Sequence, residues 1–326
     1  MPPRPGLSAI DARPAPDLIA RFNADLAALW PGGGTLALAV SGGPDSLALL
    51  LLAHAALPGG VAAATVDHGL RPEARAEADM VAALCARLGV PHAVLPVSVE
   101  SGNLQAEARA ARYAALAGWM ADQGHAALAT AHHADDQAET LLARLNRGSG
   151  VAGLAGVRAR GVAPGTRLPL LRPLLGWRRA ELGALVEAAG IAAAQDPSNQ
   201  DERFDRVRLR QALARTDWID VSALAQSAAH LADADAALEW AAQREWTERV
   251  ERAPLGLTYR PQAPRAVALR VLARIVTELD GAAPRGSQVA RLFDTLLARQ
   301  PMSIGSLVAR AMPGGWEFTR APKRRS

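Results

Sequence analysis

The chain has 326 residues, half of them apolar, which is enough for about two domains that each bury a core. Lysine and arginine together exceed aspartate and glutamate by only four, so charge alone neither establishes nor excludes a nucleic-acid partner. The single cysteine, Cys85, excludes an intrachain disulfide and any site that needs two thiolates, and the single lysine, Lys323, argues against Schiff-base chemistry.

The sequence contains no run of about 18 uncharged apolar residues, the length that a membrane span requires. Residues 1–20 alternate proline with charge and lack the apolar segment of a secretory signal. We therefore expect a cytoplasmic protein with no membrane partner. Cys85 lies in an apolar helical pattern with Val81, Leu84 and Leu88, which favours a buried structural thiol.

Apolar runs and helical patterns alternate along the first two thirds of the chain. This alternation predicts an α/β fold with a doubly wound, mostly parallel sheet. In such sheets ligands bind beyond the carboxyl ends of the strands, so the polar segments that follow the strands are expected to converge on one crevice. The expected strands are residues 35–40, 61–66, 92–97 and 126–130, and the expected helices are residues 45–56, 72–88, 103–123 and 134–145.

After about residue 215 the pattern becomes helical. Residues 221–247 read as one long helix, and two further helices follow, one ending at Gly281 and one beginning after Ser287. A short strand is expected at residues 316–319. We expect an N-terminal extension over 1–34, an α/β domain over 35–215, a linker helix over 216–253 and a small helical or α+β domain over 254–326.

The segment Ser41-Gly42-Gly43-Pro44-Asp45-Ser46 lies between an expected strand and an expected helix. Glycines allow close approach of the backbone to a ligand, and the helix start offers unpaired N–H groups, so this segment suits a phosphate group. It is neither a Walker A loop nor a dinucleotide fingerprint. Asp45 would repel phosphate unless a cation lay between them, which implies Mg²⁺. The alternative is an ordinary glycine turn with a helix cap.

Three further segments carry polar side chains that could form a site. Asp67 and His68 follow the second strand, where a capped loop is the simpler interpretation. Arg109, Arg112 and Tyr113 share one helix face, which suits phosphate contact and base stacking but also suits a solvated face paired with Glu107. The run 132–140 places two histidines at a strand end and Asp135, Asp136 and Glu139 at a helix start, where aspartates are often only caps.

These segments together resemble a known enzyme family. SGGPDS resembles the PP-loop of the N-type ATP pyrophosphatases, and VDHGLR, ARxxRY and HHxDDQxET resemble segments of the lysidine synthetases within that superfamily. Residues 146–156 (NRGSGVAGLAG), Arg172–Leu175 and Asp196–Asn199 match the same family. The family has an asparagine in the arginine run that this chain replaces by Val207, so a contact made by that asparagine is in doubt.

The resemblance implies an ATP-dependent ligase that forms a carbon–nitrogen bond and releases AMP and pyrophosphate. Its implied substrates are free L-lysine and the isoleucine tRNA with a CAU anticodon, and its implied cofactors are ATP and Mg²⁺. The implied catalytic residues are Asp45, His133, Asp135 and Asp136, of which the three aspartates would bind the metal. The implied ATP-binding residues are Ser41, Gly42, Gly43, Pro44, Asp45, Ser46, Asp67 and His68, and the implied tRNA-binding residues are Arg109, Arg112, Tyr113, Arg203, Arg206, Arg208 and Arg210.

Three alternatives are weighed against this interpretation. A tRNA thiolase of the same superfamily would need cysteines for sulfur transfer or for an iron–sulfur cluster. An amide-forming synthetase would carry a glutaminase domain with a cysteine nucleophile. A non-catalytic tRNA-binding module would not need Asp45, Asp135 and Asp136 together. The sequence leaves open whether the chain forms a homodimer.

Overall fold

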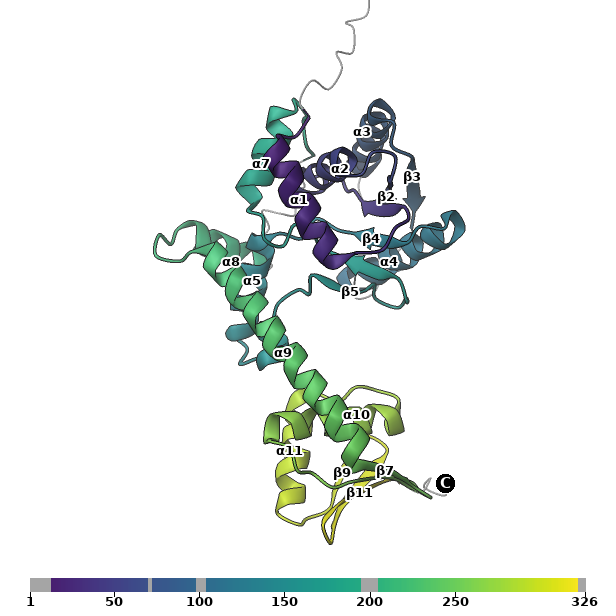
Figure 1. The fold of residues 1–326 in the computed structure, drawn as a ribbon, viewed down its shortest axis with the longest axis vertical. Helices are drawn as coiled ribbons and strands as arrows, with labels where there is room; N and C mark the ends of the chain where they lie inside the picture. The colour runs from purple at the N-terminus through teal and green to yellow at the C-terminus, as the bar shows by residue number, and fades with distance from the viewer. Residues whose placement is uncertain (1–12, 70–71, 98–103, 195–204, 322–326) are drawn as a thin grey trace, which may run out of the picture. The chain divides into compact units, whose positions relative to one another are not determined.

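The computed structural model describes residues 13–69, 72–97, 104–194 and 205–321, and the chain divides into two compact units (Figure 1). The first unit comprises Met1–Ala232 and the second Asp233–Ser326. The division falls within the helix α9, Val221–Arg249. The single long helix that the sequence predicts over 221–247 is therefore confirmed.

The first unit is built on a six-stranded sheet with the order β3-β2-β1-β4-β6-β5. All neighbouring strands are parallel except β5, which pairs antiparallel with β6. The predicted α/β fold with a mostly parallel sheet is thus confirmed. The strands are β1 (Leu36–Ala39), β2 (Val61–Asp67), β3 (His92–Pro96), β4 (Ala127–Ala129), β5 (Arg160–Val162) and β6 (Pro169–Leu171).

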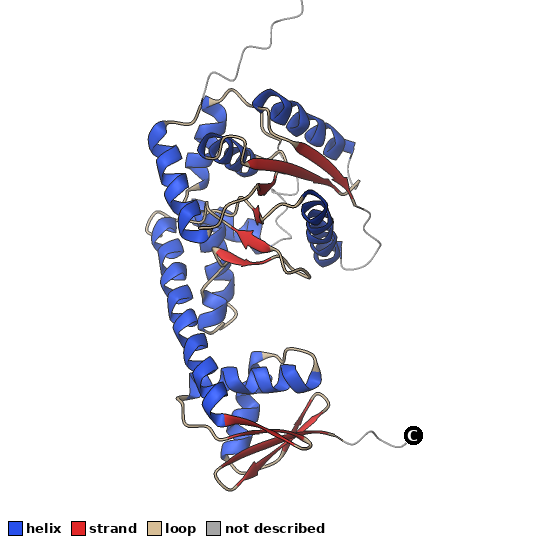
Figure 2. Ribbon diagram, turned by 45° about the vertical axis from the view of Figure 1, so that its right-hand side comes forward, coloured by secondary structure: helices blue, strands red, loops and turns tan. Residues whose placement is uncertain are grey.

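Helices cover both faces of this sheet (Figure 2). Leu36 and Leu38 of β1 point into a core formed with α1, α2, α3 and α7, whereas Ala37 points into a second core formed with α4. Strands buried on both faces need apolar side chains at every position, which explains their continuous apolar runs. The helices are α1 (Pro16–Leu29), α2 (Pro44–Ala56), α3 (Pro72–Leu88), α4 (Leu104–Gln123), α5 (Ala134–Leu145), α6 (Val151–Leu154), α7 (Arg179–Ala188) and α8 (Asp205–Ala214).

Cys85 lies on the inner face of α3 and is fully buried. Burial raises the pKa of its thiol to about 12, because the charged thiolate is disfavoured away from water. The interpretation of Cys85 as a structural residue is confirmed. Within the described part of the chain, no helix is long and apolar enough to cross a membrane.

The N-terminal segment contains a helix that the sequence analysis does not predict. The helix α1 begins at Pro16, where proline fits the first helical turn, and packs against α2. Its residues Phe22 and Leu26, one turn apart, insert into the main core with exposed fractions of 0% and 4%. The expected N-terminal extension over 1–34 therefore contains a helix at residues 16–29 that contributes to the main core.

The second unit pairs two helices with a five-stranded antiparallel sheet of order β7-β8-β11-β10-β9. Leu257, Leu307 and Phe318 alternate with partly buried residues along their strands and pack against the helices. The predicted strand at 316–319 is confirmed as part of β11, whereas the other four strands were not predicted. The elements are β7 (Val250–Ala253), β8 (Gly256–Tyr259), α10 (Arg265–Asp280), α11 (Gly286–Leu297), β9 (Met302–Ile304), β10 (Leu307–Met312) and β11 (Gly315–Arg320).

A buried carboxylate joins α9 to the sheet of the second unit. Oε1 of Glu245 accepts hydrogen bonds from the Tyr259 hydroxyl at 3.2 Å and from the backbone N–H groups of Gln262 at 2.8 Å and Ala263 at 3.1 Å. Burial, followed by the negative charge of Glu245, raises the pKa of Tyr259, so its hydroxyl stays protonated and continues to donate. The Glu245 contact therefore fixes the last turns of α9 against the segment that leads into α10.

The substitution Phe22→Ala is expected to destabilise the first unit by about 3–5 kcal/mol, because it leaves a cavity beneath α1. The neighbouring substitution Asn23→Ala removes an exposed side chain of the same helix and is expected to change the stability by less than about 0.5 kcal/mol. Urea unfolding followed by circular dichroism measures both. Equal effects of the two substitutions would show that α1 does not contribute to the core.

Candidate functional site

The loop between β1 and α2 is a compact glycine turn that opens a helix. Gly42 has φ +86°, a conformation that residues with a β-carbon rarely adopt, and Pro44 occupies the first turn of α2. The buried hydroxyl of Ser46 accepts a hydrogen bond from the Ser41 N–H at 3.1 Å and donates one to the Gly43 carbonyl at 2.9 Å. Ser46 therefore closes the loop upon itself, while Ser41 stays exposed. The N–H groups at the start of α2 are those available to an anion.

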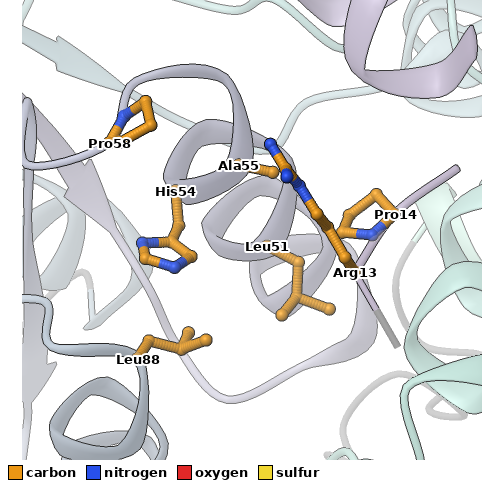
Figure 3. Close-up of a pocket in the computed structure, with 7 residues that line it drawn as sticks. All are labelled: Arg13, Pro14, Leu51, His54, Ala55, Pro58 and Leu88. Carbon is orange, nitrogen blue, oxygen red and sulfur yellow. The ribbon is translucent and has the colours of Figure 1, made fainter. Parts of the chain in front are cut away.

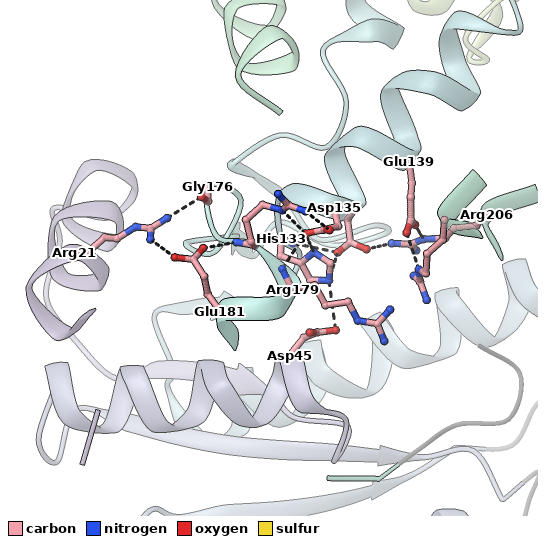
Figure 4. A network of polar contacts seen from close by, with 12 residues as sticks. Arg21, Asp45, His133, Asp135, Glu139, Gly176, Arg179, Glu181 and Arg206 are labelled. Atoms are coloured by element: carbon pink, nitrogen blue, oxygen red, sulfur yellow. Dashed lines mark hydrogen bonds and ion pairs between the residues drawn. The ribbon is translucent and has the colours of Figure 1, made fainter. Parts of the chain in front are cut away.

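His133 brings the start of α2 together with the start of α5 (Figure 4). Its side chain is 3% exposed, and its Nε2 lies 3.4 Å from Asp45 Oδ2 and 3.7 Å from Asp136 Oδ2. Its Nδ1 lies 3.7 Å from Asp135 Oδ2. The four residues that the sequence analysis proposes as catalytic thus form one cluster, drawn from two segments that follow neighbouring strands of the sheet.

The surroundings of His133 favour its charged form. Burial by itself lowers the pKa of His133, but the hydrogen bond to Asp45 and the charges of Asp136, Asp45 and Asp135 outweigh burial and raise this pKa above its ordinary value. A histidine held between three carboxylates is suited to holding these segments together. The same raised pKa makes it a poor general base, a role that the sequence analysis considered for it.

Arginines already engage the carboxylates at the start of α5. Asp135 accepts hydrogen bonds from Nε and Nη2 of Arg178, both at 3.3 Å, and from the Arg179 N–H at 2.8 Å. Burial alone would raise the pKa of Asp135, but these hydrogen bonds outweigh it and lower the pKa. Arg206 of α8 pairs with Asp136 and, at 2.5 Å, with Glu139. Asp136 and Asp135 are therefore both occupied by cationic partners.

Asp45 is the carboxylate with capacity left for a cation. Its Oδ1 is buried and has no hydrogen-bond partner, whereas its Oδ2 faces His133. Within the described residues, no three His, Cys, Asp or Glu side chains are arranged to hold a metal ion, so the expected set of Asp45, Asp135 and Asp136 is not preformed. Mg²⁺ is usually held by one or two carboxylates together with substrate phosphates, and Asp45 beside a phosphate-binding loop fits that pattern.

The segment after β2 forms a capped turn. Oδ1 of Asp67 accepts a hydrogen bond from the Gly69 N–H at 2.9 Å, and Gly69 has φ +61°. Burial, followed by the charge of Arg112, lowers the pKa of His68 and keeps this ring neutral. Asp67 thus has the structural role that its sequence context favours, while His68 lies close to the arginines of α4. Arg71 lies outside the described residues.

Tyr113 does not offer the exposed ring that the sequence analysis expects. It is 3% exposed and belongs to the core between α4 and the sheet, so its expected role in base stacking is wrong for this arrangement. The guanidinium of Arg109 lies 5.2 Å from the centre of the Tyr113 ring. Arg109 and Arg112 are exposed.

The arginine run on α8 is divided between two roles. Arg206 and Arg210 turn toward α5, where Arg210 Nε lies 2.8 Å from Glu139 Oε1, so they are ion-pair partners rather than free cations. Arg208 is exposed on the opposite side. Val207, which stands where the family has an asparagine, is buried. Arg203 lies outside the described residues, as do residues 196–199.

Gln137 of α5 fixes the glycine-rich segment that follows this helix. Its side-chain amide donates to the Val157 carbonyl at 2.9 Å and accepts from the Val157 N–H at 2.7 Å. Gly156 has φ +64°, and a β-carbon there would lie 2.4 Å from Gln137 Oε1. The sequence analysis expects a mobile or tightly turning loop, and the structure shows a tight turn that ends at this clamp.

A cavity of about 340 Å³ lies away from this cluster, at the last turns of α2 (Figure 3). It is lined mainly by apolar side chains, with His54 and Arg13 as its polar groups. Because α2 begins at the carboxyl end of β1, its last turns lie toward the amino ends of the strands, where ligands of such sheets do not bind. We therefore place the functional site at the Asp45–His133 cluster.

Comparisons with known proteins match the chain to a domain family, to curated relatives and to a solved structure. Residues 18–216 match the family model of the PP-loop domain. The chain is 51% identical to a tRNA(Ile)-lysidine synthase of Novosphingobium aromaticivorans over 310 residues, 94% of each chain, and 41% identical to one of Zymomonas mobilis over 90% of this chain and 91% of that protein. A solved U34-tRNA thiolase of Methanococcus maripaludis with a [4Fe-4S] cluster shares the fold, with a TM-score of 0.54 at 16% identity over 66% of this chain and 78% of that one.

The substitution Gly156→Ala is expected to destabilise the first unit by about 2 kcal/mol or more. The positive φ angle alone costs a residue with a β-carbon about 1–2 kcal/mol, and the Gln137 clamp must move as well. Gly161→Ala is the matched control, because a β-carbon there meets no atom within 4 Å. Thermal unfolding of both variants checks this prediction, and a stability of the Gly156 variant equal to that of the control would contradict it.

Proposed function

We infer that this chain, which belongs to the tRNA(Ile)-lysidine synthase family, ligates free L-lysine to C2 of the wobble cytidine in the isoleucine tRNA with a CAU anticodon. Its PP-loop domain binds ATP, and the reaction converts ATP to AMP and pyrophosphate. The observation that carries the proposal is the contact between Asp45 and His133. This contact links the start of α2, whose free N–H groups can bind an anion, to the start of α5, which carries Asp135 and Asp136. Both helix starts lie at the same edge of the sheet.

The first half of the reaction is adenylation of the base. The O2 oxygen of cytidine attacks the α-phosphorus of ATP, and pyrophosphate leaves. The base oxygen alone is a poor leaving group, but once it is adenylated it can leave as part of AMP. The N–H groups at the start of α2 hold the pyrophosphate portion and offset its charge. Mg²⁺, held by Asp45 and the phosphates, would neutralise the negative charge that develops on the leaving group. His133 keeps the Asp45 carboxylate in position.

The second half is attack on the adenylated C2 by the ε-amine of lysine, after which AMP leaves. The ammonium group must first lose a proton, and the carboxylates at the start of α5 are the acceptors we propose for it. Arg206 pairs with both Asp136 and Glu139, and Glu139 also pairs with Arg210, so movement of Arg206 would free Asp136 from its arginine partner. The carboxylates would also attract the cationic end of lysine before it reacts.

The tRNA would be positioned by cations outside the reacting centre. Arg109, Arg112 and Arg208 are exposed in the first unit and remain the proposed phosphate contacts. We propose that residues 35–215 perform the chemistry, that residues 216–253 act as a linker and that residues 254–326 orient the tRNA. A homodimer is not needed for the arrangement at Asp45 and His133, since all its members come from one chain.

The alternatives fit the chain less well. A [4Fe-4S] cluster is held by several cysteine thiolates, and this chain has only Cys85, which is fully buried in the core. The lone buried cysteine also gives an amide-forming synthetase no glutaminase nucleophile. A non-catalytic tRNA-binding module would have no reason to bury His133 among three carboxylates beside a phosphate-binding loop.

The proposed function predicts that the purified chain releases AMP only when ATP, lysine and the CAU-anticodon tRNA are all present. Pyrophosphate exchange into ATP is expected with tRNA alone, because adenylation precedes lysine attack. The measurement is thin-layer separation of labelled nucleotides, with the modified base identified by mass spectrometry. AMP release that needs neither lysine nor tRNA would refute the proposal.

Replacing Asp45 by asparagine is expected to lower the rate of ATP–pyrophosphate exchange by about 100-fold or more, because the charge that we assign to Mg²⁺ binding is lost. Asp122→Asn is the matched control, since Asp122 is exposed near the end of α4. Binding of tRNA, measured by filter retention, is expected to stay within about threefold in both variants. Undiminished exchange in the Asp45 variant would exclude this role.

A further inference from the structure

The segment between β6 and α7, residues 172–178, holds the start of α5 in place. The guanidinium of Arg178 donates to the Asp135 carboxylate at 3.3 Å, and the N–H of Arg179, the next residue, donates to it at 2.8 Å. The Trp177 carbonyl accepts a hydrogen bond at 2.8 Å from the N–H at the first position of α5. Because this segment consists of turns rather than of a helix or a strand, its position depends on the elements that pack against it. We call it the β6–α7 turn.

Two side chains of α1 contact the β6–α7 turn (Figure 4). Nη2 of Arg21 donates to the Gly176 carbonyl at 2.7 Å, and its guanidinium lies 4.1 Å from the centre of the Trp177 ring. One helical turn further along α1, Oδ2 of Asp25 accepts a hydrogen bond from Nε1 of Trp177 at 2.8 Å. Trp177 is 1% exposed, and a buried indole N–H needs such an acceptor. Trp177 is therefore bonded to α5 through its backbone and to α1 through its side chain.

Arg21 also contacts the N-terminal cap of α7. Its Nη1 lies 3.0 Å from Oε1 of Glu181, and Oε2 of Glu181 accepts a hydrogen bond from the Arg178 N–H at 2.7 Å. One carboxylate thus connects Arg21 to the residue whose guanidinium contacts Asp135. The side chains of Arg21 and Glu181 are 39% and 41% exposed, and exposed ion pairs add little to the stability of a fold. This pair can therefore be removed without unfolding the chain.

We propose that Arg21 is a positioning residue for the ligation, because it fixes the β6–α7 turn, which in turn fixes Asp135 and the start of α5. The proposal rests on the proposed function, in which the carboxylates at the start of α5 accept the proton of the lysine ammonium group. It gives α1, which precedes the residues that we assign to the chemistry, a part in catalysis. A displacement of about 1 Å near reacting groups can lower a rate about 100-fold, so a contact that fixes their separation affects the rate from a distance.

Asp135 is sensitive to the position of the β6–α7 turn because its carboxylate has partners on two sides. Oδ2 of Asp135 accepts the hydrogen bond from the Arg179 N–H and lies 3.7 Å from Nδ1 of His133. Nε2 of the same histidine lies 3.4 Å from Oδ2 of Asp45. A shift of the turn would therefore move Asp135 relative to His133, and His133 relative to the phosphate-binding loop.

The test compares Arg21→Gln, Glu181→Gln and the double variant with the wild-type enzyme in lysine-dependent AMP release. Each single substitution is expected to lower kcat roughly tenfold or more, while the KM values for ATP and lysine stay within about threefold. The double variant is expected to lose no more than about a further twofold relative to Arg21→Gln, because both residues act through the same turn. Circular dichroism during heating measures whether each variant is folded at the assay temperature.

Three further variants separate positioning from stability. Arg75→Gln breaks the exposed ion pair with Asp79 on α3, 3.3 Å long, and is expected to leave kcat within about twofold. Leu84→Ala leaves a cavity in the main core and is expected to lower the unfolding temperature but not the kcat of the folded enzyme. Arg21→Lys keeps the charge opposite Glu181 without the planar fork, and is expected to recover part of the lost kcat. Glu181→Gln serves if Arg21→Gln fails to fold.

A kcat of the Arg21→Gln and Glu181→Gln variants within about twofold of wild type would overturn the proposal. So would an equal loss in Arg75→Gln or Leu84→Ala, because the loss would then follow from reduced stability. Losses that multiply in the double variant would also overturn it, since the two residues would then act independently. If the wild-type enzyme itself released no AMP in response to lysine, the proposed function would fail instead. The wild-type measurement therefore separates the two claims.

Discussion

The arrangement of the site depends on the buried contact between His133 and Asp45, which joins the loop after β1 to the segment after β4. These strands are adjacent in the sheet, so the two helix starts already lie side by side, and the histidine fixes their separation. The contact continues outward through Asp135 to Arg178 of the α7 cap, from there to Glu181, and from Glu181 to Arg21 of α1 (Figure 4). The N-terminal helix is thereby connected to the phosphate-binding loop.

Arginine compensates the acidic side chains at this edge of the sheet. Arg178, Arg206 and Arg210 neutralise acidic side chains that would otherwise repel one another at the start of α5. A guanidinium can contact two carboxylates at once, as Arg206 does with Asp136 and Glu139, and an ammonium group on a flexible stem does this less well.

The sequence was sufficient to predict the βα repeats and the convergence of their polar ends, but not the pairing between distant segments. Continuous apolar runs that follow a glycine identify β1 to β4, whereas β5 contains an arginine and a glycine and β6 begins at a proline, so neither stands out as such a run. Asp45, His133, Asp135 and Asp136 were predicted to meet, because each follows the carboxyl end of a strand. The arginine partners of Asp135, Asp136 and Glu139 lie 43 to 71 residues further along the chain, so no local sequence pattern could identify these pairs.

The two oxygens of Asp45 explain how a carboxylate can stand beside a phosphate-binding loop. In the arrangement described, Oδ2 is compensated by His133, while Oδ1 is buried without a partner. A buried carboxylate oxygen left unpaired costs free energy, and a cation that arrives with a triphosphate relieves that cost and screens the repulsion between Asp45 and phosphate. We infer that the loop is selective for metal-loaded nucleotide for this reason: free phosphate would meet the negative charge of Asp45, whereas the metal complex would satisfy it. His133 is then expected to hold Asp45 in place both with and without nucleotide, because it contacts Oδ2 in the protein alone.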